Sequence, residues 1–426
     1  MEKKCVSVMM ALALLFSGCL SGPPDLDGDG IDDEDDLDID GDGWDNAVEL
    51  NCSSDSLLSS STPLDTDEDG ECDILDNDDD GDGWGDYTEL DCSTDPLDNS
   101  SIPEDYDGDR ICDSLDEDAD GDGLPNDWEQ ERGFDHLDDE DYISCHGMSE
   151  YCLRQYDDFT FAETHNSYSS SEDGILVGTN HYTGLQAQWE GGIRAFMLDP
   201  HHRSEEDTSA SDIRFCHGTG QFFHACQFGE VDAFSWLREL GSLLNNSSGD
   251  VVSLLIENFY TPAEHLEFLF NETGILERAF IHDLNESWPS IGDLSLMGKD
   301  IVIFVELEYD SSYPFFNAAW KHSWDTPYGQ RDSEDMTCEL GRGDHSQPVW
   351  HLSNWLTSTF GLADPVGAEE VNDYDFLLNR TLDCWRENEN RPTFVAVDYW
   401  EQGELTNVTI TLNKMSHWSD EIPTRP

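Results

Sequence analysis

Beyond residue 157, short apolar runs alternate with longer stretches of mixed polarity. The runs are rich in β-branched and aromatic residues, which predicts strands. They lie at residues 159–163, 193–198, 213–216, 251–256, 301–305, 349–352 and 394–397. Between them, residues 233–244 and 263–280 carry apolar side chains at helical spacing, which predicts helices. This alternation over about 260 residues predicts an α/β, TIM-barrel-like (β/α)8 domain. A doubly wound sheet is the alternative, but no glycine-rich nucleotide loop follows the first strand.

The N-terminal part of the chain shows no such pattern. Residues 23–144 hold 48 of the 96 acidic residues and only two basic ones, Arg110 and Arg132. A segment of this composition cannot bury an ordinary apolar core, so two domains are expected. The formal net charge of the chain is −77. Without a basic patch, nucleic acid is not expected as a partner.

An acidic motif recurs in this part with a period of 40 residues, each time as D-x-D-x-D-G-x₅-E. Its acids are Asp38, Asp40, Asp42 and Glu49; Asp78, Asp80, Asp82 and Glu89; and Asp118, Asp120, Asp122 and Glu129. In such loops, oxygens at positions 1, 3, 5 and 12 surround one Ca²⁺, and glycine at position 6 permits the sharp turn. A half-motif precedes each by 13 residues, beginning at Asp25, Asp65 and Asp105. Six calcium loops are therefore predicted.

The stretches between these loops are short, polar and interrupted by cysteines, so no amphipathic helices of an EF-hand are expected there. Alternating loops with periodic cysteines resemble thrombospondin type 3 repeats, over about residues 24–135. The resemblance implies a calcium-filled stalk with little apolar core. A disordered acidic tail is the alternative, but it would not keep glycine and glutamate in register three times.

The extreme N-terminus has the pattern of a targeting segment. Lys3 and Lys4 precede an apolar stretch, residues 6–16, that ends in Ser17-Gly18-Cys19. This ending resembles a lipoprotein signal, which implies removal of residues 1–18 and a lipid on Cys19. The protein is then expected on the extracellular face of the cell membrane, lipid-anchored. An ordinary secretory signal, giving a secreted protein, is the alternative. No later segment is long and apolar enough to span a bilayer.

Cysteine usage agrees with an oxidising compartment, because ten cysteines remain without Cys5 and Cys19. The ten are Cys52, Cys72, Cys92 and Cys112 at intervals of 20, then Cys145, Cys152, Cys216, Cys226, Cys338 and Cys384. Cys145 with Cys152 and Cys216 with Cys226 can close short loops, which leaves Cys338 and Cys384 as a longer-range pair. Zinc is the competing interpretation, but the chain has no C-x-x-C pair.

Polar residues directly follow the predicted strands of the second domain. They are His165, Asn166, Asp199, His217, Glu257 and Asp398. Active sites of barrels are built from the carboxyl ends of strands, which favours one shared site. Imidazole titrates near neutral pH, so two histidines can supply an acid and a base. The amide and the carboxylates offer the oxygen ligands that hard cations prefer.

Four ordered motifs carry a second resemblance. They are T-H-N-S-Y at 164–168, G-I-R-A-F-M-L-D at 192–199, F-C-H-G at 215–218 and L-I-E-N at 255–258. They resemble the phosphatidylinositol-specific phospholipase C X-domain superfamily over about residues 157–410, within a domain expected at 145–426. The resemblance implies a distorted TIM barrel and a phosphoric diester hydrolase or lyase. Its substrate would be a phospholipid or a related phosphodiester.

The resemblance also implies roles for individual residues. His165 would be the general base on an inositol-type 2-hydroxyl, and His217 the general acid or a partner that stabilises the phosphate. Asp398 would orient His165. Arg194 is expected to contact the substrate headgroup.

A metal site is implied by the same motifs. Asn166, Asp199 and Glu257 would bind Ca²⁺, with Mg²⁺ as a possible substitute. Met197 stands where calcium-dependent eukaryotic relatives have a fourth ligand, so Glu306 or Glu308 is a candidate to contribute. His201 and His202, just after Asp199, could touch the site, but a loop histidine is more often a solvated surface group.

Two other functions compete with this hypothesis. A non-enzymatic, calcium-dependent adhesion or binding protein could retain the barrel, but such a relative is expected to have lost at least one of the five motif residues. A glycerophosphodiester phosphodiesterase is also a barrel with two histidines and a metal. Its His-Arg-Gly opening and Glu-x-Asp pair are absent here.

Overall fold

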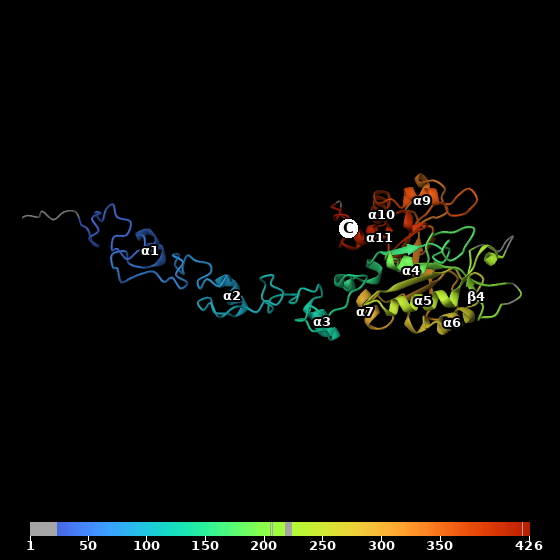
Figure 1. The fold of residues 1–426 in the computed structure, drawn as a ribbon, viewed down its shortest axis with the longest axis horizontal. Coiled ribbons are helices and arrows are strands. Elements are labelled where there is room, and N and C mark those ends of the chain that lie inside the picture. The colour runs from blue at the N-terminus through green and yellow to red at the C-terminus, as the bar shows by residue number, and fades with distance from the viewer. Residues whose placement is uncertain (1–23, 205, 207, 218–223, 420) are drawn as a thin grey trace, which may run out of the picture. The chain divides into compact units, whose positions relative to one another are not determined.

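A computed structural model describes residues 24–204, 206, 208–217, 224–419 and 421–426. The chain divides into two compact units. The repeat unit comprises described residues up to 121 together with 125–139, and the barrel unit comprises 122–124 and 140–426. The repeat unit is blue to cyan in Figure 1, and most of the barrel unit is green to red. The signal segment and Cys19 lie outside the described residues, so the lipid anchor stays a prediction.

The regular elements have the following bounds. The helices are α1 (Asn46–Cys52), α2 (Asp86–Cys92), α3 (Asn126–Arg132), α4 (Leu185–Glu190), α5 (Ala233–Asn245), α6 (Ala263–Glu272), α7 (Ile291–Leu296), α8 (Ala319–His322), α9 (Pro365–Val371), α10 (Tyr374–Asn388) and α11 (Leu405–Asn413). The strands are β1 (Phe161–Thr164), β2 (Ala195–Leu198), β3 (Pro200–His202), β4 (Ile213–Phe215), β5 (Val231–Asp232), β6 (Val252–Ile256), β7 (Ala279–Phe280), β8 (Ile301–Val305), β9 (Asn317–Ala318), β10 (Ser323–Asp325), β11 (Arg342–Gly343), β12 (Val349–Asn354) and β13 (Phe394–Val397).

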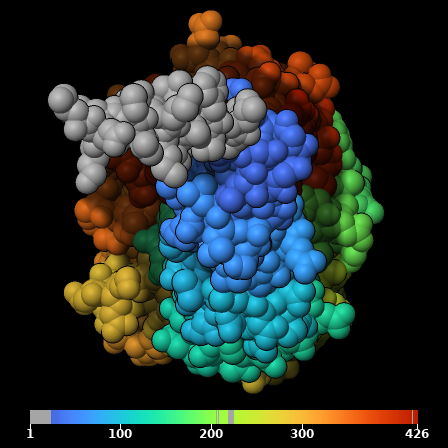
Figure 2. Space-filling view, turned by 90° about the vertical axis from the view of Figure 1, so that its left-hand side faces the viewer, coloured from blue at the N-terminus to red at the C-terminus, as the bar shows by residue number. Residues whose placement is uncertain are grey.

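In the repeat unit, each full acidic loop leads into one short helix. The helices α1, α2 and α3 carry Glu49, Glu89 and Glu129, the last ligand of each predicted loop, in their first turns. The repeats succeed one another in sequence order, from blue to cyan in Figure 2. Short helices therefore follow the full loops, where the sequence shows no amphipathic pattern. The helices are only 7 residues long, and among the described residues none precedes the first loop, so the EF-hand remains excluded.

The barrel unit is built on a curled, mainly parallel sheet. Neighbouring strands run in the order β10-β12-β13-β1-β2-β6-β8, and β9 pairs with the end of β8. β7 pairs in parallel with the beginning of β8, and β11 is antiparallel to β10. Among the described residues no pairing joins β9 to β10, so the barrel is open there. The prediction of an α/β, TIM-barrel-like fold is confirmed.

The strands are buried along their whole length because both faces of the sheet are covered. Outside, apolar side chains of α5, α6, α10 and α11 share one core with the strands. Inside, Phe304 of β8 lies 6.3 Å from Phe394 of β13, between ring centroids. The interior also holds a buried hydrogen bond between His351 Nδ1 and Glu163 Oε2, at 2.9 Å. Alternate residues of each strand thus point into the barrel and fill it, up to the end where the carboxyl ends of the strands lie.

Ten cysteines form five disulfides. The pairs are Cys52–Cys72, Cys92–Cys112, Cys145–Cys152, Cys216–Cys226 and Cys338–Cys384. The three pairs suggested by spacing in the second domain are confirmed, and the zinc interpretation is wrong because these thiols are used in disulfides. In the described part of the chain, no helix combines the length and apolarity needed to cross a bilayer.

All seven apolar runs form strands, but two predictions at the level of elements are wrong. β4 does not belong to the barrel: it is the middle strand of a separate antiparallel sheet, β3-β4-β5. The helix predicted over 263–280 ends at Glu272, and Gly274 follows with a φ of 77°. The chain then turns into β7. β10 was not predicted, because Ser-Trp-Asp has no apolar run.

Candidate functional site

The polar residues that follow the strands meet at one end of the barrel. His165 and Asn166 follow β1, Asp199 follows β2, Glu257 follows β6 and Asp398 follows β13. These strands are parallel neighbours, so their carboxyl ends share one edge of the sheet. His217 comes from β4 outside the barrel. The hydrogen bond from Cys216 N to Asp199 O, at 3.2 Å, ties the segment before it to the end of β2.

His165 and Asp398 form a hydrogen-bonded pair. His165 Nδ1 lies 3.0 Å from Asp398 Oδ1, and the Asp398 side chain is only 2% exposed. A carboxylate accepts, so Nδ1 carries the proton and Nε2 of the neutral ring keeps its lone pair. The Trp355 ring stacks on the imidazole with 4.2 Å between centroids and 12° between planes. Stacking and hydrogen bond together fix the orientation of the ring.

Asn166 lies between the two histidines. One of its side-chain amide atoms is 3.2 Å from His165 Nε2 and 3.0 Å from His217 Nδ1. The two imidazole nitrogens are therefore no more than about 6 Å apart. The Asn166 backbone has a φ of 50°, a left-handed conformation that asparagine tolerates better than most residues. This turn directs the amide across the end of the barrel.

The other amide atom of Asn166 is 3.1 and 3.3 Å from the two Asp199 carboxylate oxygens. Nitrogen at this position would donate to Asp199. Oxygen at this position would face two other oxygens, a contact that is favourable only with a cation among them. The second orientation turns the amide NH₂ toward His165 Nε2, which accepts in the tautomer described above, whereas the first turns the amide oxygen toward His217 Nδ1, which can donate to it. The donor set thus fits a hard divalent cation.

Asp199 is the centre of this group. It is buried, accepts a 3.0 Å hydrogen bond from Tyr168 Oη, and lies 3.4 Å from His217 Nδ1. Burial lowers the pKa of His217, but the hydrogen bond and the charge of Asp199 outweigh burial and raise it overall. A raised pKa increases the charged fraction of His217, which suits a general acid.

Two further carboxylates crowd the same end of the barrel. The charge of Asp199, followed by burial, raises the pKa of Glu257 well above its usual range. Burial also raises the pKa of Glu306, against the opposing effect of Arg342. Packed carboxylates of this kind repel one another, and a bound divalent cation would relieve the repulsion.

The candidates for a fourth metal ligand are both engaged. Glu306 Oε1 is 2.7 Å from Arg342 Nη1, and Glu308 Oε1 is 2.6 Å from Lys321 Nζ. Met197 is buried in β2. Asn166, Asp199 and Glu257 stay the predicted ligand set, and each candidate for a fourth ligand is ion-paired through one of its carboxylate oxygens.

Arg194 is not near this group, and the prediction that it binds the headgroup is wrong. It precedes β2 and so lies at the amino end of the strand, opposite the site. Its Nε donates to Asp250 Oδ2 at 2.8 Å, and its guanidinium stacks on Trp189 at 3.6 Å. His201 and His202 also differ from expectation, since both are buried in β3. Burial lowers the pKa of His201 to about 4.

Two residues of the site were missed by sequence reasoning. Trp355 follows β12, where its ring stacks on His165. Asn180 lies in the long loop after β1, and its Nδ2 donates to Asp398 Oδ1 at 2.7 Å. The position of Trp355 after a predicted strand was a usable signal, but no pattern in the sequence marks Asn180.

The repeat unit holds a second set of candidate ligands. In the first two full loops, Glu49 and Glu89 are completely buried and Asp40 and Asp80 nearly so. Each of these four residues has at least one buried carboxylate oxygen without a hydrogen-bond partner. Burial, then Asp80 and Asp82, raise the pKa of Glu89 to about 7. Buried, mutually repelling carboxylates fit a cation better than water.

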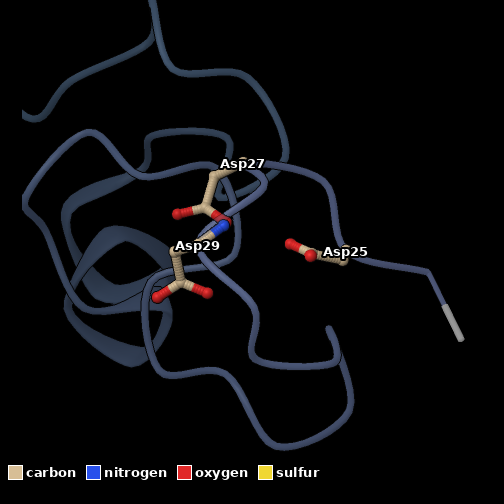
Figure 3. A group of neighbouring side chains, drawn as sticks. All are labelled: Asp25, Asp27 and Asp29. Carbon is tan, nitrogen blue, oxygen red and sulfur yellow. The ribbon is translucent and has the colours of Figure 1, made fainter.

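The half-motifs are more exposed. Figure 3 shows the carboxylates of Asp25, Asp27 and Asp29 around a common space. Ligand oxygens of these three side chains lie within 4.8 Å of one another, as do those of Asp65, Asp67 and Asp69 and of Asp105, Asp107 and Asp109. The spacing of the oxygens agrees with the predicted calcium loops, although exposed acids also cluster without an ion.

Comparison with known proteins identifies the family of the barrel unit. The profile of the PI-PLC X family matches residues 151–413, more than half of the chain. The chain belongs to the PI-PLC X family. A PI-PLC X domain-containing protein 1 from Arthroderma benhamiae is 24% identical over 286 residues, covering 63% of this chain and 89% of that protein. A PI-PLC X domain-containing protein from Arabidopsis thaliana is 22% identical and covers 61% and 62%.

A third relative, from Arthroderma benhamiae, is described as an uncharacterized secreted protein. It is 22% identical over 302 residues, covering 64% of each chain. This relative and the plant relative are thus matched over less than two thirds of their own length. Among solved structures, the phosphatidylinositol-specific phospholipase C of Listeria monocytogenes has 11% identity, covers 61% of this chain and 94% of its own, and gives a TM-score of 0.42. An enzyme of the same name from Staphylococcus aureus gives 0.40.

Proposed function

We propose that the barrel unit is a phospholipase C-like phosphodiesterase that uses His165 and His217 as base and acid. One observation carries the proposal: both imidazoles contact the Asn166 side chain, and His165 is paired through its other nitrogen with buried Asp398. Because one amide atom contacts both rings, the two imidazoles are close enough to act as base and acid on one phosphodiester. Membership of the PI-PLC X family supports this reaction class.

The chemistry follows from the protonation states. His165 Nε2 accepts the proton of an inositol-type 2-hydroxyl, whose oxygen then attacks phosphorus. The bond from phosphorus to the lipid alcohol breaks, and His217 donates its proton to the departing oxygen. The products are a cyclic phosphodiester and a diacylglycerol-like alcohol, and water can later open the ring. Asp398 stabilises the imidazolium that forms on His165.

We also propose that Ca²⁺ binds beside this pair, with Mg²⁺ as a weaker substitute. Asn166, Asp199 and Glu257 would hold it through oxygen, which agrees with the raised pKa of Glu257. The ion would supply positive charge for the phosphate oxygens and acidify an adjacent hydroxyl. The six acidic loops of the repeat unit are proposed as further Ca²⁺ sites, supported in the first two full loops by buried oxygens of Asp40, Glu49, Asp80 and Glu89 that have no hydrogen-bond partner.

A lipid substrate is favoured by the loops around the site. Leu176 in the loop after β1 is 84% exposed, and Phe360 in the loop after β12 is 89% exposed. The two loops are adjacent, since a Cβ on Gly178 would lie 3.4 Å from Leu362 Cδ2. Residues 355–363 carry no charged side chain. Exposed apolar residues beside a catalytic pair suit a substrate that sits in a membrane.

The charge of the chain after residue 144 limits the type of membrane to which it can bind. The chain after residue 144 has 47 acidic against 15 basic residues, so an anionic membrane is repelled overall. We therefore propose a phospholipid presented in a largely zwitterionic membrane. The protein would reach it from the extracellular face, through a lipid on Cys19 or as a secreted protein.

The experiment is phosphorus NMR of vesicles that contain phosphatidylinositol, phosphatidylcholine or a glycosylphosphatidylinositol, each with calcium and with a chelator. In calcium, we expect a new resonance of a cyclic phosphodiester headgroup, or of the monoester formed when water opens its ring, from one of the two inositol lipids, because choline has no hydroxyl that could attack phosphorus. No turnover of any diester would overturn the assignment. Absence of turnover would favour the alternative, a non-enzymatic binding protein. No residue of the described site supports that alternative independently.

A further inference from the structure

Asn180 makes an unusual set of contacts for a loop residue. It lies between β1 and α4, and its side chain is 3% exposed. Its Nδ2 donates to Asp398 Oδ1 at 2.7 Å, the same oxygen that lies 3.0 Å from His165 Nδ1. Its backbone oxygen accepts from Tyr399 N at 2.6 Å. Asn180 therefore holds both the side chain of Asp398 and the backbone just after it.

The loop around Asn180 is itself fixed to the end of β1. Asn180 N donates to Ser169 O at 2.8 Å, and His181 Nε2 lies 2.8 Å from His165 O. On the other side, Asn372 Nδ2 donates to Asp398 O at 2.7 Å. The Asp398 backbone and carboxylate are thus held independently, and the carboxylate is held by Asn180 together with His165.

The type of side chain determines what this contact does. An amide NH₂ can only donate, so it cannot take a proton from Asp398 or accept one from His165. Asp398 Oδ1 is left as an acceptor for both neighbours. Asn180 Nδ2 also lies 3.4 Å from His165 Nδ1, but its hydrogen bond to Asp398 Oδ1 is much shorter, at 2.7 Å. With Asp398 Oδ1 as the acceptor, His165 donates from Nδ1 and the Nε2 lone pair is directed at the site. A second donor also limits rotation of the carboxylate, which a single hydrogen bond to a ring would not.

We propose that Asn180 is a positioning residue that orients Asp398 and thereby selects the Nδ1-protonated tautomer of His165. The inference rests on the proposed function, because it assigns the base a required tautomer. It does not give Asn180 any contact with substrate.

The first test compares Asn180→Ala and Asn180→Leu with wild type on the diester that wild type cleaves. Leucine keeps most of the volume, so it covers the case in which alanine leaves the protein unfolded. We expect kcat to fall about tenfold to a hundredfold, since a misplaced catalytic group has this cost, with KM unchanged. Asn413→Ala is the control: Asn413 is equally buried and exchanges two hydrogen bonds with Thr160 at the amino end of β1. It should lower stability and leave kcat unchanged.

The second test asks whether Asn180 acts through Asp398. If it does, Asn180→Leu in an Asp398→Asn background should cause no further loss of kcat, because the partner is already disabled. Asn413→Ala should have the same effect on stability in both backgrounds. Equal kcat in wild type and both Asn180 variants, or a full additional loss in the double variant, would overturn the proposal.

A third measurement does not need turnover. Nitrogen NMR of the His165 ring distinguishes the two neutral tautomers. Wild type should show a protonated Nδ1 at a pH where the ring is neutral, and Asn180→Leu a mixture. The same Nδ1-protonated signal in both would contradict the inference. If wild type cleaved no diester but Asn180→Leu still shifted the tautomer as expected, only the proposed function would be contradicted.

Discussion

Three histidines of the barrel unit show how the surroundings of one side chain set its chemistry. His165 has a buried acceptor on one side and the site on the other, which makes it a base. His217 has its pKa raised, because Asp199 outweighs burial. Burial lowers the pKa of His146 to about 4, although Asp250 opposes the shift. The last of these cannot serve catalysis, but it affects stability.

Asp398→Asn should lower kcat by at least about a hundredfold. The amide still fills the space, but it does not stabilise the imidazolium, and its NH₂ can hold His165 in the wrong tautomer. Initial rates at saturating substrate measure the effect. A variant with the wild-type rate would show that the 3.0 Å contact has no role in the reaction.

His146 should make stability fall as the solution becomes acidic. Its pKa is about 4 in the folded protein and near 6.5 in the unfolded chain, so the unfolded state binds more protons between these values. The contribution is fully present above pH 6.5 and is lost as pH falls toward 4, by up to about 3 kcal/mol. His146→Asn removes this titration, and asparagine accepts the φ of 51° found there.

The measurement is the urea dependence of unfolding at pH 7.0, 5.5 and 4.0, with calcium present throughout. The difference in free energy of unfolding between wild type and variant should become smaller, or change sign, toward pH 4. A constant difference across the three values would show that His146 titrates normally in the folded state.

At the scale of residues, the sequence predicted which side chains lie together where each of them directly follows a buried strand. His165, Asp199, Glu257 and Asp398 each continue a buried strand, so their convergence could be expected. Asn180 reaches Asp398 through the path of a 20-residue loop, which no pattern encodes. Arg194 was misassigned because it stands in a recognised motif but at the opposite end of β2 from the site.

At the scale of elements, the loops rather than the strands distinguish this barrel. The loop after β1 carries both Asn180 and Leu176, and the loop after β12 begins at Trp355 and includes Phe360. Each loop therefore contains one residue that contacts the His165–Asp398 pair and one apolar side chain that is exposed. The proposed membrane contact and the orientation of the His165–Asp398 pair therefore involve the same two segments.

Leu176→Ser and Phe360→Ser should each weaken binding to phosphatidylcholine vesicles by about tenfold or more, because each removes an apolar side chain from the surface that enters the membrane. Met297→Ser is the matched control, since Met297 is 54% exposed but precedes β8, at the other end of the barrel. Vesicle sedimentation measures the partition. Equal effects of all three substitutions would disprove a specific docking surface.

The long strands of the barrel were predictable because buried parallel strands are continuous apolar runs, and of the helices α5 and part of α6 were predicted from their apolar spacing. Elements that depend on neighbours were not. β10 is short and polar and is held by pairing with β12, while β4 pairs with β3 and β5 outside the barrel. The helices α1 to α3 are too short to show a pattern, and they form around the glutamate that ends each loop.

At the scale of the whole molecule, two units of different physical character share one chain. The barrel unit has a large apolar core, whereas the repeat unit buries carboxylates in place of apolar side chains. Without counterions these carboxylates repel one another, so the stability of the repeat unit should depend on calcium. Two disulfides within it, Cys52–Cys72 and Cys92–Cys112, limit how far it can open.

Removal of calcium should expand the repeat unit and leave the barrel unit folded. Cleavage by a glutamate-specific serine protease should then concentrate at residues 24–139. Glu89→Gln, which removes one buried ligand, should produce the same local sensitivity at a higher calcium concentration than wild type. Identical digestion patterns in calcium and in chelator would remove the calcium assignment from the repeats.

The central claim is that His165 initiates cleavage of a phosphodiester at the end of this barrel. The most direct test is phosphorus NMR of phosphatidylinositol vesicles in calcium with wild type, His165→Ala and His417→Ala, the last an exposed histidine outside the site. We predict a cyclic or opened inositol phosphate signal from wild type and His417→Ala, and a rate about a hundredfold to ten-thousandfold lower from His165→Ala. Equal turnover by all three proteins would contradict the account.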